Sequence, residues 1–431
     1  MAREYRDSGI EWIGQIPKEW EIGKVKNYYS LQTGFTPDTK NELYYDDNGA
    51  LWVNISDMGD SHYISNTKKK ISDYYISKFK PPIVPKGSLL YSFKLSVGTV
   101  AIAGEEMYTN EAIAAFLQKD GINLSFLYYS SQVCIIFNAN ENIYGAKLLN
   151  QDLINNATII FPPLAEQQKI ANYLDEVCGE VEEMIALQEQ MIEELKAYKQ
   201  SVITEAVTKG LNPNVPMRDS GIDWIGEIPE HWKVTVLRRF ATIILGKMLQ
   251  PNAKSDDDTL EQYICAKDVH FEGIDFSDLK KMYFDKDEKE TYQVQKGDML
   301  VVEGGAGAAG SCVLKTDLPD TYIQNSIMIV RPKQGIDIRY IQYFEFSLVK
   351  KGYVDFVCNK ATIPHFTKDK LSSMPIPLPP LSEQQSIASY LDTKCAEIDA
   401  LIAIKQAKID ELKDYKKSVI YEYVTGKKEV A

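Results

Sequence analysis

The sequence predicts an α+β protein built from one unit that occurs twice. Residues 6–20 (RDSGIEWIGQIPKEW) recur as residues 218–232 (RDSGIDWIGEIPEHW), with 11 of 15 positions identical. Residues 163–175 (PLAEQQKIANYLD) recur as residues 380–392 (PLSEQQSIASYLD), with 10 of 13 identical. Offsets of 212 and 217 residues far exceed the roughly 20–50 residues of a solenoid repeat. We therefore expect a duplicated pair of domains.

The first expected domain covers residues 1–161. Its short apolar runs at 50–56, 87–93 and 98–104 (ALWVNIS, GSLLYSF and GTVAIAG) are separated by turn-forming residues. Runs of this length and composition are typical of strands. They predict a mixed α/β domain with substantial sheet.

The second expected domain covers residues 211–378 and has the same skeleton. Its apolar runs include 298–303 and 325–332 (DMLVVE and NSIMIVRP). Gly98 aligns with Gly310, and we expect both glycines to hold a tight turn or bulge. Between such matched positions the two sequences differ widely, so the frame is shared and the loops are not.

A helical region follows each domain, over residues 162–210 and 379–431. Both regions open with Pro-Pro and then Ala/Ser-Glu-Gln, which favours a helix start, and both end near a glycine. Their apolar residues alternate in steps of three and four, which predicts the heptad seam of a coiled coil. The first seam comprises Ile170, Leu174, Val177, Val181, Met184, Gln188, Met191, Leu195, Tyr198 and Val202. The second comprises Ile387, Leu391, Ile398, Leu401, Lys405, Leu412, Tyr415 and Val419.

The two long helices are expected to pack on each other. Each has one apolar stripe about 35–40 residues long and needs a partner of similar length. Two similar halves pack most simply about a pseudo-two-fold axis, which predicts an antiparallel coiled coil separating the two domains. The alternative is that each amphipathic helix packs only on its own domain.

Composition limits the class of protein. The 431 residues suffice for two to four domains with adequate cores. There is no apolar run of membrane-spanning length and no signal peptide, so we expect a cytoplasmic protein without a membrane partner. The six cysteines are scattered and the four histidines lack metal-ligand spacing, so no metal site is predicted.

The charge distribution leaves nucleic-acid binding open. The net charge is −13, but residues 161–210 alone hold 4 Lys and Arg against 10 Asp and Glu. Residues 1–160 hold 15 against 18, and residues 211–375 hold 21 against 24. A domain near charge balance can still present a basic face to phosphates.

No catalytic site is predicted. Residues 305–310 (GAGAAG) match the dinucleotide-binding fingerprint, but a strand and turn follow where that fold requires a helix. Ser311 stands where a P-loop needs lysine. No methyltransferase motif is present, and the acidic triplets at 38–40 and 287–289 have no counterpart in the other copy. We therefore expect no catalytic residues in this chain.

Two repeated motifs allow either a structural or a binding role. The paired tryptophans, Trp12 with Trp224 and Trp20 with Trp232, more often anchor a domain to a neighbouring helix than stack on a base. The Glu-Gln-Gln motifs at 166–168 and 383–385 are explained either by helix-start chemistry or by docking of a partner.

The whole arrangement resembles the specificity subunit of type I restriction-modification enzymes. The resemblance rests on the RDSGIxWIGxIPxxW block before each variable domain and the PPLxEQxxIAxxLD helix after it, each present twice. It implies a non-catalytic, double-stranded-DNA-binding subunit whose two target-recognition domains each read one half of a bipartite, asymmetric site. The conserved helices would act as a spacer and would dock two modification subunits.

The resemblance also implies where the chemistry lies. The modification subunits would bind S-adenosylmethionine and methylate adenine, and restriction subunits would add ATP- and Mg²⁺-dependent translocation and cleavage. No cofactor is expected in this chain. A coiled-coil scaffold without DNA binding and a stand-alone DNA-modifying enzyme are the alternatives.

Residues that contact DNA have to be inferred from side-chain chemistry, because they lie in the variable part. Phosphates are bound by Lys and Arg, and base edges by polar or aromatic side chains. The candidates of the first domain are Lys68, Lys69, Lys70, Tyr74, Tyr75, Lys78 and Lys80, with Lys94 and Ser96 in a loop between paired strands. Those of the second are Lys247, Lys267, Lys280, Lys281, Lys360 and His365.

Overall fold

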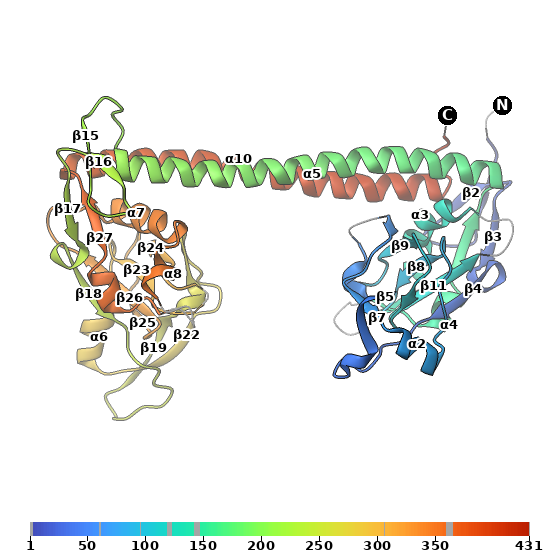
Figure 1. The fold of residues 1–431 in the computed structure, drawn as a ribbon, viewed down its shortest axis with the longest axis horizontal. Helices are drawn as coiled ribbons and strands as arrows, with labels where there is room; N and C mark the ends of the chain where they lie inside the picture. Colours follow the sequence, from blue (N-terminus) through green and yellow to red (C-terminus); the bar gives the residue numbers. More distant parts are fainter. Residues whose placement is uncertain are drawn as a thin grey trace. The chain divides into compact units, whose positions relative to one another are not determined.

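The computed structural model describes residues 3–59, 62–94, 96–118, 123–141, 147–305, 307–358 and 365–430. It divides into two compact units, one of residues 1–189 with 407–431 and one of residues 190–406. The division falls inside both long helices, α5 (Leu164–Lys209) and α10 (Leu381–Val424) (Figure 1). Each unit therefore contains a segment of each helix. No helix in the described part is long and apolar enough to cross a membrane.

Both long helices begin and end where their sequences predict. They start directly after the Pro-Pro pairs, and each is followed by a glycine with positive φ, 74° at Gly210 and 69° at Gly426. Such a left-handed residue ends a helix without the steric cost that a Cβ would add.

Unit 1 is built on a five-stranded sheet with the order β4-β11-β8-β9-β6. The α3 helix (Leu124–Cys134) packs against it, and a three-stranded sheet of order β10-β5-β7 lies beside α2 (Asp73–Phe79). The strands of the large sheet are β4 (Tyr29–Thr33), β6 (Tyr63–Ile64), β8 (Leu89–Ser92), β9 (Val100–Ala103) and β11 (Ile113–Gln118). Those of the small sheet are β5 (Tyr45–Val53), β7 (Lys69–Ile71) and β10 (Tyr108–Thr109).

Unit 2 repeats this topology, except that its large sheet has four strands and no counterpart of β6. Its sheets have the orders β18-β26-β23-β24 and β22-β19-β25. The accompanying helices are α7 (Ile338–Lys350) and α6 (Lys286–Tyr292). The strands are β18 (Ala241–Leu245), β19 (Thr259–Ile264), β22 (Lys280–Phe284), β23 (Met299–Val302), β24 (Ser311–Val313), β25 (Thr321–Ile323) and β26 (Ile327–Pro332). The expected α+β class and the duplication are both confirmed.

Short elements complete the units. Unit 1 adds β1 (Tyr5–Asp7), β2 (Gln15–Pro17), β3 (Glu21–Lys24), α1 (Val25–Tyr28), β12 (Asn140–Glu141), β13 (Lys147–Leu148), α4 (Gln151–Asn155) and β14 (Thr158–Phe161). Unit 2 adds β15 (Met217–Asp219), β16 (Glu227–Pro229), β17 (Lys233–Val236), β20 (Val269–His270), β21 (Gly273–Ile274), α8 (Tyr353–Val357), α9 (Lys368–Ser372) and β27 (Pro375–Leu378). The hairpins β1–β2 and β15–β16 contain the repeated N-terminal block.

Two repeated tryptophans anchor the domains. Trp20 and Trp232 are each 1% exposed, and each lies in the main core cluster of its unit. Arg6 donates to the carbonyl of Trp20 at 2.7 Å, and Arg218 donates to that of Trp232 at 2.6 Å. The structural interpretation of these tryptophans is therefore confirmed.

The central glutamine of each Glu-Gln-Gln motif joins the long helix to its domain. Gln167 is buried, accepts from the backbone N–H of Asn123 at 3.1 Å and donates to the carbonyl of Pro162 at 2.9 Å. Gln384 makes the equivalent bonds to Asp337 and Pro379, both at 2.9 Å. Asn123 and Asp337 are the N-caps of α3 and α7, so the motif fixes the helix start and the domain together.

The two long helices pair within each unit. In unit 1, the rings of Tyr173 and Tyr423 lie 4.5 Å apart and Glu182 pairs with Lys416, so the segments run antiparallel. In unit 2, Lys199 bonds both oxygens of Asp399 at 2.8 Å. Lys199 and Lys416 are 217 residues apart, as are the two acids. The repeat offset therefore extends to this ion pair, and the antiparallel pairing is confirmed.

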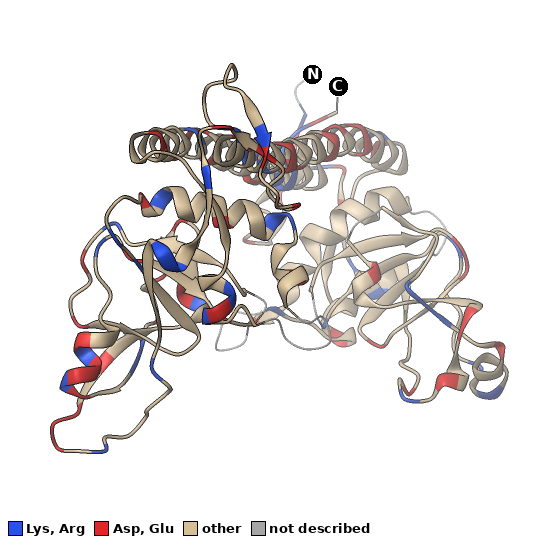
Figure 2. Ribbon diagram, turned by 60° about the vertical axis from the view of Figure 1, so that its left-hand side comes forward, with Lys and Arg blue, Asp and Glu red and all other residues tan. Residues whose placement is uncertain are grey.

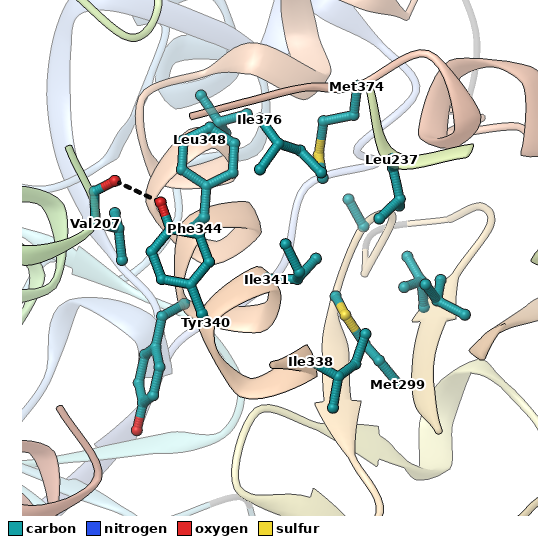
Figure 3. Packing of buried hydrophobic residues seen from close by; sticks show 14 of the residues in the cluster. Val207, Leu237, Met299, Ile338, Tyr340, Ile341, Phe344, Leu348, Met374 and Ile376 are labelled. Carbon is teal, nitrogen blue, oxygen red and sulfur yellow. Dashed lines mark hydrogen bonds between the residues drawn. The ribbon is translucent and has the colours of Figure 1, made fainter. Parts of the chain in front are cut away.

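The helices also pack on their own domains. In unit 1, Ile170 and Leu174 of α5 share a cluster with residues of the large sheet and α3. In unit 2, Val207 of α5 lies against α7, where Tyr340 donates to its carbonyl at 3.1 Å (Figure 3). Helix pairing and helix–domain packing are thus both present.

The predicted seam is wrong at five positions. Met184, Met191, Tyr198, Leu401 and Tyr415 are exposed. Val181, Ile398 and Leu412 of the predicted seam are buried as expected, and the structure adds Cys178, Ile192, Cys395 and Ile409, which are buried but lie outside the predicted seam. Apolar residues occur in adjacent pairs along α5, so two stripes one residue apart satisfy the same heptad spacing. Compact Cys and Ile side chains are buried in place of Met and Tyr.

Candidate nucleic-acid interface

A pair of lysines occupies the same place in each small sheet. Lys69 of β7 lies across from Trp52 of β5, and Lys280 of β22 lies across from Tyr263 of β19. The aromatic partners are buried, whereas Lys69 and Lys280 are exposed. Of the next residues, Lys70 is half-buried and Lys281 is exposed. Because successive side chains on a strand point to opposite faces, each pair places a lysine on either side of its strand.

Aromatic rings contact two of the candidate lysines of unit 1. Lys69 lies 5.4 Å from the ring centroid of Tyr45. On α2, Lys78 lies 5.3 Å from the ring of Tyr74 and donates to its hydroxyl at 3.2 Å, which raises the pKa of Lys78. Tyr74 is exposed, and its ring stacks on Tyr44 with centroids 6.3 Å apart. Cationic and aromatic side chains thus lie together at this surface.

Three other candidates of unit 1 have structural roles. Tyr75 is buried and stacks on Phe35 at 5.2 Å, so the structure places it in the core, unlike the expected DNA contact. Lys68 donates to the carbonyl of Ser56 at 2.7 Å. Lys80 ends α2 in the left-handed conformation, with φ 45°.

Lys94 and Ser96 lie in the predicted turn between β8 and β9, and both are exposed. The pKa of Glu111 is lowered by a hydrogen bond from Thr36 and, to a smaller extent, by the positive charge of Lys94.

In unit 2, Lys247 is buried and paired within the protein, whereas the sequence predicts an exposed phosphate contact at this position. Its side chain is 6% exposed, donates to the carbonyl of Tyr283 at 2.8 Å and pairs with Glu288. It also lies 5.0 Å from the ring centroid of Phe284. Lys247 is instead an internal support for a loop, because a lysine can be buried when its charge is paired.

The remaining candidates of unit 2 differ in their surroundings. Lys267 pairs with Asp278 at 2.8 Å, and this bond raises the pKa of Lys267. His365 is exposed, and its backbone bridges to Gly304. Lys360 lies outside the described residues. Figure 2 shows basic and acidic positions interspersed along the ribbon of each unit.

The structure adds a pair of glycines that the sequence comparison missed. Gly34 follows β4 and Gly246 follows β18. A Cβ at Gly34 would lie 1.7 Å from the carbonyl oxygen of Thr109, and one at Gly246 would lie 2.4 Å from that of Gln324. The signal in the sequence was a glycine three or five residues before a proline, in TGFTP and LGKMLQP. Each glycine starts a loop leading to the small sheet.

Comparison with known proteins identifies the family. The model of the type I restriction modification DNA specificity domain matches residues 17–197 and again residues 229–414. The chain therefore belongs to this family. It is the DNA-specificity component of such a system and not its catalytic component. Among the described residues, no group of three or more His, Cys, Asp or Glu is arranged to hold a metal ion.

Relatives match over nearly the full length. The putative type I restriction enzyme MjaX specificity subunit of Methanocaldococcus jannaschii is 25% identical, over 96% of this chain and 95% of the relative. The EcoBI specificity subunit of Escherichia coli is 23% identical, over 93% and 84%.

Two solved structures show the same fold. The HsdS subunit of Thermoanaerobacter tengcongensis covers 95% of this chain and 98% of its own, with a TM-score of 0.50 and 18% identity. A chain from work on complex assembly and conformational transition of the type I R-M system has the same coverage, with a TM-score of 0.70 and 17% identity.

Proposed function

We propose that this protein reads a bipartite, asymmetric DNA site. Residues 1–161 and 211–378 would be two target-recognition domains, each reading one half-site. The observation that carries the proposal is the equivalence of Lys69-Lys70 and Lys280-Lys281. All four lysines are among the candidates that residue chemistry predicts, and the two pairs lie on equivalent strands, β7 and β22, of the duplicated small sheet. Both copies place lysines on the same strand of the small sheet, where they can contact phosphates, and differ in the surrounding loops. This arrangement is what we expect of two recognition domains that bind DNA alike but read different bases.

The helical regions, residues 162–210 and 379–431, would dock two modification subunits. Support comes from the exposed apolar residues that the helix pairing leaves uncovered: Met184, Leu187 and Tyr415 in unit 1, and Met191, Tyr198, Leu401 and Ile404 in unit 2. A docked partner subunit would cover these apolar side chains. The modification subunits would bring S-adenosylmethionine, and restriction subunits would use ATP and Mg²⁺. The assembly would act on DNA in the cytoplasm.

Methylome sequencing tests the proposal. A host would express the modification subunits with the wild-type chain, with Lys69→Ala/Lys70→Ala or with Lys280→Ala/Lys281→Ala. We expect one bipartite methylated motif that requires the chain and is weakened by either variant. Binding of the purified complex to the motif should become less salt-dependent, with the slope falling by about 0.9 for each phosphate that the variant no longer neutralises. An unchanged salt slope in both variants would contradict the proposed interface.

A further inference from the structure

We propose that Met248 and Leu249 in unit 2 read a thymine methyl group in the half-site of the second domain. This inference rests on the proposed function and names a specificity-determining contact within it. The two residues follow Gly246 and Lys247 at the start of the loop between β18 and β19. Met248 is 75% exposed and Leu249 57% exposed. They therefore form an apolar loop tip that the protein itself does not cover.

The loop is held at its base by buried contacts. The backbone N–H of Lys247 donates to the carbonyl of Ile323 at 3.1 Å, and the carbonyl of Lys247 accepts from Asn325 at 2.8 Å. The Lys247 ammonium pairs with Glu288 and reaches the carbonyl of Tyr283. The backbone at Gly246 passes close to that of Gln324. Only glycine fits there, because a Cβ would collide with the Gln324 backbone.

The far side of the loop is braced as well. Asp258 accepts from the backbone N–H of Lys254 at 2.8 Å, from Gln250 Nε2 at 2.9 Å and from Ser255 Oγ at 2.8 Å. These bonds lower the pKa of Asp258, with the Lys254 bond as the largest cause. A loop supported at both ends presents Met248 and Leu249 in a defined position, which reduces the entropy lost on binding.

The loop lies beside the lysines of β22. The backbone N–H of Tyr283 donates to the carbonyl of Gln250 at 3.0 Å, and Tyr283 is two residues from Lys281. The apolar tip is thus next to the strand that would contact phosphates. A cavity of about 580 Å³, lined by residues 247–254 with Glu288 and Tyr292, borders it. Of the four base edges in the major groove, only thymine offers a methyl group to apolar side chains.

The same position in unit 1 has different chemistry. After Gly34, Phe35 turns into the core and donates its backbone N–H to the carbonyl of Thr109 at 2.8 Å. Thr36 then donates its hydroxyl to Glu111, and Pro37 follows. After the glycine, unit 1 therefore presents the hydroxyl of Thr36, whereas unit 2 presents the two apolar side chains of Met248 and Leu249. This is the difference expected at a position that distinguishes two half-sites.

The test uses the full chain in complex with its modification subunits. The target motif is first read from the methylome. Duplexes carrying that motif are then made with thymine or uracil at each A·T position of the second half-site, because uracil lacks only the methyl group. We expect uracil at one position to weaken binding of the wild-type complex by about fivefold or more. The Met248→Ser/Leu249→Ser variant should bind both duplexes equally.

Controls separate this inference from the proposed function. Phe276→Ser removes an equally exposed apolar side chain of unit 2 outside this loop and should leave the uracil effect intact. A second half-site without an A·T pair, or a uracil effect that persists in the double variant, would overturn the inference. If Lys280→Ala/Lys281→Ala leaves binding unchanged as well, the proposed DNA surface fails with it.

Discussion

At the scale of single residues, unit 2 contains a carboxyl group that burial keeps protonated. Glu345 of α7 is 1% exposed, accepts from Ser311 Oγ at 2.6 Å, and its Oε1 atom lacks a hydrogen-bond partner. Burial raises its pKa to about 8, although the Ser311 bond acts in the opposite direction. Counted from the N-caps of α3 and α7, the matching residue of unit 1 is Ser131. Unit 2 therefore has a buried carboxyl group at a position where unit 1 has a serine.

Replacing Glu345 with Gln should remove a pH dependence of stability. The folded pKa is raised above the ordinary 4.5, so the folded state holds a proton that the unfolded chain loses between about pH 4.5 and 8. The wild-type protein should lose stability as pH rises through this window, and Glu345→Gln should lose less. At pH 8 we expect the variant to melt a few degrees higher, as measured by circular dichroism. Glu290→Gln, at an exposed position, is the control and should leave the pH profile unchanged.

His62 of unit 1 gives the opposite pH dependence. Its ring stacks on Tyr128 at 3.8 Å, and Nδ1 lies 3.9 Å from Asp175. Burial lowers its pKa, while Asp175 and Glu182 partly oppose the shift and Lys416 adds to it. The His62 ring also lies 6.1 Å from Tyr129, and in unit 2 the residue that matches Tyr129 is Tyr343, whose ring centroid lies 5.7 Å from that of Phe271. Unit 1 therefore uses a titratable ring where unit 2 uses an apolar one.

His62→Phe should make unit 1 more resistant to acid. A histidine whose folded pKa is depressed contributes stability above its ordinary pKa of 6.5, and that stability is lost as pH falls through this value. Thermal melts between pH 7.5 and 5 should show a smaller loss in the variant than in the wild type. His270→Phe changes an exposed histidine and should melt like the wild type. Parallel acid profiles for His62→Phe and the wild type would contradict this prediction.

At the scale of elements, the junction between helix and domain depends on one glutamine in each copy. Gln384→Ala would leave the N–H of Asp337 and the carbonyl of Pro379 without their partner. An unsatisfied buried polar group costs about 1–3 kcal/mol, so denaturant unfolding should show a loss of that order. Gln385→Ala, at the exposed neighbouring position, should cost little. Equal losses in both variants would mean that the junction does not depend on Gln384.

The observed helix seam can be tested by comparing lysine substitutions inside the seam with lysine substitutions outside it. Leu195→Lys/Leu412→Lys places charges at half-buried and buried positions, where an unpaired charge is costly. We expect loss of helical signal on mild heating and no assembly with modification subunits. Met191→Lys/Tyr415→Lys alters positions that the sequence placed in the seam but the structure leaves exposed. Its melting temperature should match the wild type, even if partner binding is weakened.

At the scale of the whole molecule, the duplication predicts that the two proposed recognition domains are exchangeable. The repeated blocks at 6–20 and 218–232, and at 163–175 and 380–392, provide matched junctions. A chain in which residues 21–161 replace residues 233–378 should therefore fold with both domains of type 1. Methylome sequencing should then find a bipartite motif whose two halves have the same sequence. A motif that keeps the original second half-site would assign base reading to the repeated regions.

The sequence alone determined the class, the duplication, the limits of both long helices and the family. These features are encoded locally, in apolar periodicity, in Pro-Pro and Gly signals and in motifs that occur twice. It also selected Lys69-Lys70 and Lys280-Lys281, because cationic side chains on a short strand are visible without a fold.

Only the tertiary structure decided which of two possible stripes is buried in the helix pair. It also showed that Lys247 and Tyr75 are buried, although the sequence predicted that they are exposed. It placed Gly34 and Gly246 at equivalent positions, where each backbone passes close to another segment. Each of these outcomes depends on partners far away in the chain. Lys247 is buried because Glu288 lies opposite it, and Gly246 is required because the backbone of Gln324 passes close by. Such contacts between distant segments leave no periodic or local pattern in a single sequence.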